Sequence, residues 1–286
     1  LAQLAEEMNF DALSYSEHHF YTEGMEAGAT PIPRLLNLLY HTKRIQVGPV
    51  GFVLPTWDPI RLAEDIAWAD HMSKGRVFVG LARGFFPRWV NVLGQKYGVE
   101  PGTSGPEAEL RNREVFQELF EVMKLSWKDE PFSFKGKYYQ APFPAEGHAW
   151  AAHEATRRYG APGEVDDKGW LRKISPVPKP YQKPHPPLVR ACIGKDSLVS
   201  MAKIGRPVLI GVEKLDELAL RLELYRDTML SSGFGELEVK KSLDETWVRK
   251  SVYVAEGDEQ AMEEALPAFQ AERRHVREAR ERFNPS

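Results

Sequence analysis

The sequence predicts an α/β fold in which parallel strands alternate with helices. Short apolar runs of strand length alternate along the chain with longer segments whose apolar residues recur at helical spacing. The apolar runs are nearly continuous, which is typical of strands buried on both faces of a parallel sheet. With 286 residues, the chain suits one β/α barrel domain, because such barrels often have about 250 residues.

Six strands and seven helices are expected from this alternation. The strands span residues 10–16, 45–54, 77–82, 187–193, 207–212 and 246–255. The helices span residues 1–8, 31–43, 59–72, 106–127, 195–204, 214–231 and 258–282.

Local signals support the individual elements. The segment 1–8 carries apolar residues at helical spacing, and four leucines form the apolar stripe of the segment 31–43. Glycine and proline interrupt the apolar run over 45–54, which we interpret as one strand. Pro59 begins the next helix and Gly75 follows it, since proline favours the first helical turn and glycine the position after the last.

Residues 129–186 break the rhythm of strand and helix. This segment is rich in proline and aromatic residues, and we interpret it as an excursion from a single domain over 1–286, with a hairpin over 132–139. We expect the excursion to cover the mouth of the barrel. Six strands do not close an eight-stranded barrel, so the simplest barrel has its first and last strands missing from this chain. An open doubly wound sheet is the alternative.

Composition excludes several classes of function. The net charge is −3 and no segment carries a dense run of Lys or Arg, which argues against a nucleic-acid binder. A single cysteine, Cys192, excludes an intramolecular disulfide and is typical of a cytoplasmic protein. We see no membrane span, signal peptide, nucleotide-binding glycine motif or metal-ligand spacing in the sequence.

Two histidines follow the first strand. Glu17, His18 and His19 come where the apolar run ends, and strand ends are where barrel enzymes place their chemistry. Because side chains alternate along a strand, we expect only one imidazole to face the barrel mouth, where it would transfer a proton. Alternatively, the pair caps the strand by hydrogen bonding.

Two further segments could hold a phosphate. Arg83 and Gly84 end the third strand, and an arginine fork beside a glycine suits an anion; Arg113 is a second candidate. Gly194 and Ser197 begin a helix, where free N–H groups attract phosphate. The alternatives are a surface ion pair for each arginine and ordinary capping for Ser197.

Several segments together resemble one family. They are the motif Glu17-His18-His19-Phe20 and the segments 53–65, 72–84 and 178–187. In this order they resemble the bacterial luciferase family of flavin-dependent monooxygenases, and the resemblance runs from residue 1 to about 270.

The resemblance implies a luciferase-like (β/α)8 TIM barrel that binds reduced FMN at the carboxyl ends of its strands, usually within a homodimer. It implies an FMNH2-dependent monooxygenase that inserts one oxygen atom of O2 into a small organic substrate through a C4a-peroxyflavin. A separate reductase would supply the reduced flavin.

The family pattern also assigns roles to particular residues. His18 matches the catalytic histidine, and the peptide bond between Val50 and Gly51 matches a cis bond beneath the flavin ring. The positions that match cofactor-binding residues are Glu17, Val50, Gly51, Ala82, Arg83, Arg113, Gly194 and Ser197. No metal ligand is implied.

The sequence departs from the family pattern at two positions. Ala82 stands where luciferases have a cysteine in the flavin site, and Ile193 stands where they have a glutamate. Two other functions stay open: an F420-dependent oxidoreductase that transfers hydride, because related barrels use that deazaflavin, and a non-catalytic flavin-binding subunit. Turnover without oxygen would distinguish the hydride-transfer enzyme.

Overall fold

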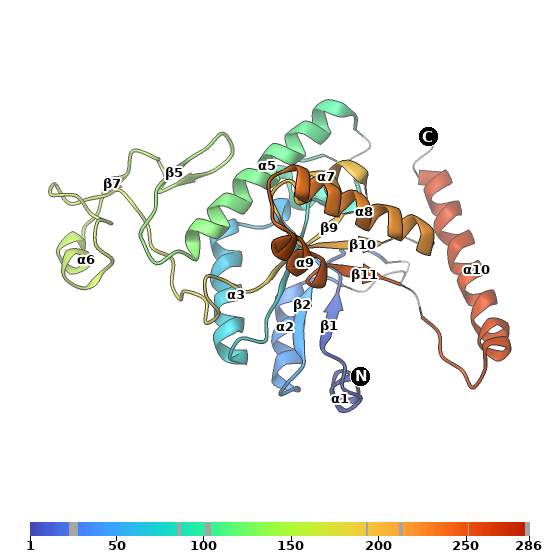
Figure 1. Ribbon diagram of the computed structural model, residues 1–286. Helices are drawn as coiled ribbons and strands as arrows, with labels where there is room; N and C mark the ends of the chain where they lie inside the picture. The colour runs from blue at the N-terminus through green and yellow to red at the C-terminus, as the bar shows by residue number, and fades with distance from the viewer. Residues whose placement is uncertain are drawn as a thin grey trace.

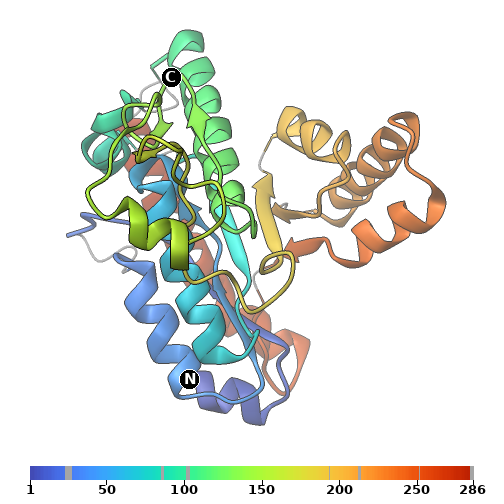
Figure 2. The ribbon, with the colours of Figure 1, turned by 90° about the vertical axis from the view of Figure 1, so that its left-hand side faces the viewer.

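The computed structural model of the chain describes residues 1–22, 28–84, 87–100, 104–192, 194–211, 214–250 and 252–283. Figure 1 shows strands at the centre with helices around them, and Figure 2 shows α7, α8 and α9 grouped on the side away from α2, α3 and α5.

The strands of the central sheet are parallel and lie in the order of the chain. β1 (Ala12–Tyr15) pairs with β2 (Gln46–Pro49), and β3 (Phe52–Val53) pairs with β4 (Val79–Ala82). β4 then pairs with β9 (Leu188–Cys192), which is followed by β10 (Val208–Gly211) and β11 (Trp247–Arg249). A doubly wound sheet reverses its strand order at a switch point. The sequential order therefore favours a barrel.

The sheet is curved. The ring centroids of Phe78, just before β4, and Trp247, in β11, are 4.8 Å apart although two strands lie between these elements in the sheet. Phe78 is buried. Contact across two intervening strands requires the sheet to bend toward itself, as strands of a barrel do.

All seven predicted helices are present. They are α1 (Ala2–Glu7), α2 (Pro31–Tyr40), α3 (Pro59–Ser73), α5 (Pro106–Ser126), α7 (Lys195–Ala202), α8 (Leu215–Ser231) and α10 (Asp258–Phe283). Asp58 caps α3 by accepting hydrogen bonds from the N–H groups of Ile60 and Arg61. Lys74 ends this helix in the left-handed conformation, one residue before Gly75.

The structure adds short helices that the periodicity did not predict. These are η1 (Leu54–Thr56), α4 (Pro87–Leu93), η2 (Gln95–Tyr97), α6 (His153–Tyr159) and α9 (Glu236–Asp244). Apart from α9, they have at most seven residues, too few for a helical period to stand out in the sequence.

Two expected strands are shorter in the structure. The apolar run over 45–54 is divided into β2 and β3 at a cis peptide bond between Val50 and Gly51. β11 covers only Trp247–Arg249 of the predicted 246–255, and Val252, Tyr253 and Val254 beyond it are exposed. The predicted strand ends at 193 and 212 lie outside the described residues.

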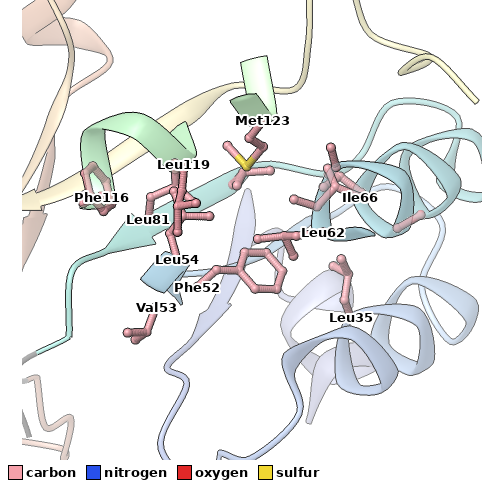
Figure 3. Close-up of a cluster of buried hydrophobic side chains, with 14 of the residues drawn as sticks. Leu35, Phe52, Val53, Leu54, Leu62, Ile66, Leu81, Phe116, Leu119 and Met123 are labelled. Carbon is pink, nitrogen blue, oxygen red and sulfur yellow. The ribbon is translucent and has the colours of Figure 1, made fainter. Parts of the chain in front are cut away.

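The core has two main parts. The larger one lies between the strands β2 to β4 and the helices α2, α3 and α5, and Figure 3 shows its side chains, among them Phe52, Leu62 and Met123. The second joins β9 and β10 to α7, α8 and α9, and Tyr225 is fully buried within it.

The excursion forms an arm beside α5. It contains two small hairpins, β5 (Phe134–Lys135) with β6 (Gln140–Ala141) and β7 (His148–Ala149) with β8 (Trp170–Leu171). Figure 1 shows this arm extending away from the central strands. The hairpin predicted over 132–139 is therefore present, with its second strand slightly later.

The arm is attached to the outer faces of two helices. The carboxylate of Glu118 on α5 accepts hydrogen bonds from three consecutive backbone N–H groups, those of residues 137–139. Buried Asp70 on α3 accepts from the backbone and side-chain N–H groups of Gln182. These contacts lie along the sides of α3 and α5, not over the strand ends where we expected the excursion. Within the described part of the chain, no helix has the length and apolar character needed to cross a membrane.

Candidate functional site

The carboxylate of Glu17 joins the end of β1 to β3. Glu17 is 2% exposed. Its Oε2 accepts from the Val53 N–H at 2.7 Å, and both oxygens lie within 3.1 Å of the Trp57 indole nitrogen. Nε2 of His19 is 3.1 Å from Oε1. The known contacts of Glu17 are therefore internal ones, and we interpret it as a structural link; the cofactor-binding role that the family pattern implies for it stays a prediction.

Both histidines lie beside one indole. The imidazole centroids of His18 and His19 lie 6.2 Å and 5.0 Å from the ring of Trp89 on α4, which is buried. Strand β1 ends at Tyr15, and His18 forms an isolated β-bridge with Gly28 beyond it. The expectation that only one imidazole faces the barrel mouth stays a prediction. His18 touches Tyr21 as well, at a centroid distance of 5.7 Å.

His18 is the better candidate for proton transfer. Burial, followed by the nearby charge of His19, lowers the pKa of His18 below its ordinary value. His18 is therefore neutral at neutral pH and able to accept a proton. His19 is already engaged with the carboxylate of Glu17.

The predicted cis bond between Val50 and Gly51 is confirmed. The backbone at this bond lies directly against β4: a Cβ atom on Gly51 would be 2.5 Å from the carbonyl carbon of Gly80, and one on Gly80 would be 2.6 Å from Val50 Cα. Glycine on both sides is therefore what allows β2 and β3 to approach β4 at this point. Ala82, at the end of β4, is half-buried and packs against the larger core cluster.

Four basic side chains surround a cavity of about 280 Å³. Arg83 follows β4, Arg113 lies on α5, Arg190 lies on β9 and Lys195 begins α7. The start of α7 supplies the other lining residues, Gly194, Asp196, Ser197 and Ser200. The structure thus brings together the four predicted phosphate-site residues, which are Arg83, Arg113, Gly194 and Ser197.

Glu109 links two of these arginines. Its Oε1 accepts hydrogen bonds from Nη1 of Arg83 and from Nε of Arg113, the latter at 2.8 Å. Partial burial favours the neutral acid, but the hydrogen bonds and charges of Arg113 and Arg83 outweigh it and hold the pKa of Glu109 below its usual value. The ion pairs that the sequence left open as the alternative for both arginines are therefore present, and both arginines also line the cavity.

The start of α7 is open toward the cavity. Apart from its chain neighbours, no atom of the described residues lies within 4 Å of a Cβ atom built on Gly194, which leaves the backbone there accessible to a ligand. The Ser197 hydroxyl donates to the Gly194 carbonyl at 2.7 Å, which orients its oxygen at the first turn. Ile193, which replaces the family's glutamate, lies outside the described residues.

Sequence reasoning missed Arg190, Glu109 and Trp89. Arg190 stacks over the Phe116 ring at 4.9 Å, and burial lowers its pKa below the usual value. Its place inside an apolar strand was a usable signal, since a charged residue in a buried strand needs a reason. Glu109 lies one helical turn before Arg113, a spacing typical of ion pairs.

Two relatives of this chain are monooxygenases by name. The 3,6-diketocamphane 1,6-monooxygenase of Pseudomonas putida is 31% identical over 144 residues, which are 50% of this chain and 37% of that protein. The alkanal monooxygenase alpha chain of Photobacterium leiognathi is 40% identical over 94 residues, 33% of this chain and 26% of its own length. The matches thus span little more than a third of these relatives, or less.

The fold is shared with solved structures. The FMN complex of the oxygenating constituent of 3,6-diketocamphane monooxygenase from Pseudomonas putida superposes with a TM-score of 0.72 at 21% identity, over 99% of this chain and 69% of that one. This likeness confirms the predicted luciferase-like barrel fold. The sequence model of the luciferase-like monooxygenases matches residues 1–285, and the chain therefore belongs to that family.

Proposed function

We propose that the chain binds FMN with its phosphate in the basic cavity between β4, α5, β9 and α7. The observation that carries this proposal is the convergence of Arg83, Arg113, Arg190 and the N-terminus of α7 on one cavity. Guanidinium forks and free helix N–H groups are the donors that suit a phosphate. Arg83 and Arg113 each keep further N–H groups besides the one given to Glu109.

The charge of the cavity supports a phosphate monoester. The lining residues Arg83, Arg113, Arg190 and Lys195 contribute four positive charges, and Asp196 contributes one negative charge. Glu109, which pairs with Arg83 and Arg113 from outside the lining, contributes a second negative charge, so the formal charge of the cavity with this carboxylate included is +2. A phosphate monoester carries roughly −1.5 to −2 near neutral pH. FMN has such a monoester, whereas the phosphate of F420 is a phosphodiester, which carries a lower charge.

The proposed reaction is the insertion of one oxygen atom of O2 into a carbonyl compound. The named relatives are an alkanal monooxygenase and a diketocamphane monooxygenase, and both names contain a carbonyl substrate. Reduced FMN, when bound, supplies the electrons that activate O2. His18 would hold or accept a proton beside the substrate, and Glu17 and Trp89 would keep the two imidazoles in place.

We further propose that a separate reductase delivers the reduced flavin and that the chain works as a homodimer. Trp68 and Met72 on α3 are exposed and one helical turn apart. A second copy of the chain would cover such a pair. Analytical ultracentrifugation of the wild type and of Trp68→Glu tests the homodimer.

Titration of the protein with FMN and with riboflavin tests the phosphate site, since riboflavin lacks the phosphate. We expect FMN to bind at least about tenfold more tightly than riboflavin. Arg83→Met or Arg113→Met should lower the affinity for FMN about tenfold and leave the affinity for riboflavin unchanged. Arg111→Met is the matched control, because Arg111 is on the same helix but pairs with Glu100. Equal affinity for FMN and riboflavin would contradict the proposal.

The oxygen dependence tests the reaction. With FMNH2 and a carbonyl substrate, one labelled oxygen atom from ¹⁸O2 should appear in the product, and turnover should stop without O2. Anaerobic turnover with reduced F420 would instead favour hydride transfer. His18→Ala should lower turnover and leave the FMN affinity near that of the wild type.

A further inference from the structure

We propose that Glu109 determines the charge of the anion that the basic cavity accepts, by acting as a built-in counter-ion that disfavours ligands more highly charged than a phosphate monoester. This inference rests on the proposed phosphate site and concerns a residue to which the family pattern assigns no role.

The size of the cavity does not select a single phosphate group. At about 280 Å³, it is many times larger than the space that one water molecule needs. A diphosphate therefore fits the space as well as a phosphate does. Selection between the two must come from charge or from the arrangement of donors.

Glu109 is placed where its charge acts on the ligand through two arginines. It does not line the cavity itself, but one of its carboxylate oxygens accepts hydrogen bonds from Arg83 and Arg113, which do. Its side chain is 33% exposed and that of Arg83 is 26% exposed. Water therefore screens the carboxylate of Glu109 only in part. The carboxylate repels a bound anion in proportion to the charge of that anion.

The two ion pairs also explain why the carboxylate stays ionised. The arginines hold the pKa of Glu109 below its usual value, so it carries its charge throughout the neutral range. With Glu109 present the formal charge of the cavity is +2, and without it the charge is +3. The lower value matches a monoester, and the higher one would favour a more highly charged anion.

The test measures the binding of inorganic phosphate and inorganic pyrophosphate to the whole chain by calorimetry at low ionic strength. Glu109→Gln keeps the shape of the side chain and removes its charge. We expect phosphate to bind roughly threefold to tenfold more tightly to this variant, and pyrophosphate to gain by a larger factor, so that the preference shifts toward pyrophosphate.

Two controls separate charge from positioning. Glu109→Asp keeps the charge but shortens the side chain, and it should keep the wild-type preference between the two anions. Glu107→Gln removes the same charge from an exposed position two residues earlier and should leave the preference unchanged. Circular dichroism of each variant confirms that it is folded.

Weaker binding of both anions to Glu109→Gln would overturn the inference, because it would mean that Glu109 only orients the arginines. An unchanged preference would overturn it too. Inorganic anions probe the cavity without a flavin. If the chain bound no FMN, the proposed function would fail, while the anion preference of the cavity could still be measured.

Discussion

Replacing Glu17 by alanine should destabilise the fold before it affects any ligand. The Glu17 side chain is 1% exposed, and it is the acceptor for the N–H of buried Val53 and for the indole N–H of Trp57. A buried donor that loses its acceptor costs about 1–3 kcal/mol. The N–H of Val53 should be left unsatisfied at the full cost, and the indole N–H of half-buried Trp57 at part of that cost. The free energy of unfolding should therefore fall by about 2–4 kcal/mol.

Urea denaturation followed by circular dichroism measures this loss. Glu121→Ala is the control, since Glu121 is exposed on α5 and surface substitutions usually change stability by no more than about 0.5 kcal/mol. A double-mutant cycle with Trp57→Phe isolates the bond to the indole. The two substitutions should show a coupling of at least about 0.5 kcal/mol, because either one alone breaks the same bond.

The reasoning about Glu17 is wrong if Glu17→Ala lowers the unfolding free energy by less than about 1 kcal/mol or if the two substitutions are additive. A variant that kept its stability but lost FMN affinity would restore the cofactor-binding role that the family pattern implies for Glu17.

Two further predictions concern the fold around the site. Hydrogen bonds from the N–H groups of Ile45, Arg44 and Lys43 lower the pKa of Glu6 from 4.5 to about 2. Because the pKa of Glu6 is lower in the folded state than in the unfolded state, the stabilisation that its carboxylate gives the fold is complete above pH 4.5 and is lost as the pH falls toward 2. Glu6→Gln should therefore melt below the wild type at pH 7, with a gap that closes between pH 4.5 and 2, and a gap that is constant with pH would exclude this role. Gly80→Ala should cost about 3 kcal/mol, because the new methyl group would meet the backbone of Pro49 and Val50. Gly211→Ala should be tolerated, because the same atom there meets no atom of the described residues within 4 Å. Equal melting temperatures for the two variants would refute the close approach of the end of β2 to β4.

Local patterns in the sequence predicted most of the helices and strands. Pro59 with Gly75 marked α3, and the apolar runs marked the strands of the central sheet. α9 was missed although a signal exists: the carboxylate of Glu238 accepts from the N–H of Gly235 at 2.9 Å, and this spacing is typical of a helix start. α4 carried no such signal, because valines and an asparagine in a seven-residue helix have low helical propensity.

The candidate site could be predicted only in part. Arg83, Gly194 and Ser197 follow from motifs that stand at strand ends and helix starts, and Arg113, inside α5, follows from the family resemblance; the structure brings all four to one cavity. Arg190 could not be predicted in the same way, since the face to which a strand residue points depends on the register of the sheet.

By itself, the sequence determined the order of strands and helices, the family, and the candidate residues at strand ends. These depend on periodicity and on local motifs, which are properties of neighbouring residues. Only the tertiary structure decided that Glu17 is buried, that both histidines share Trp89, and that Glu109 stands between two arginines. Each of these contacts joins segments from different elements, and their meeting depends on how the sheet curves and how the helices pack against it.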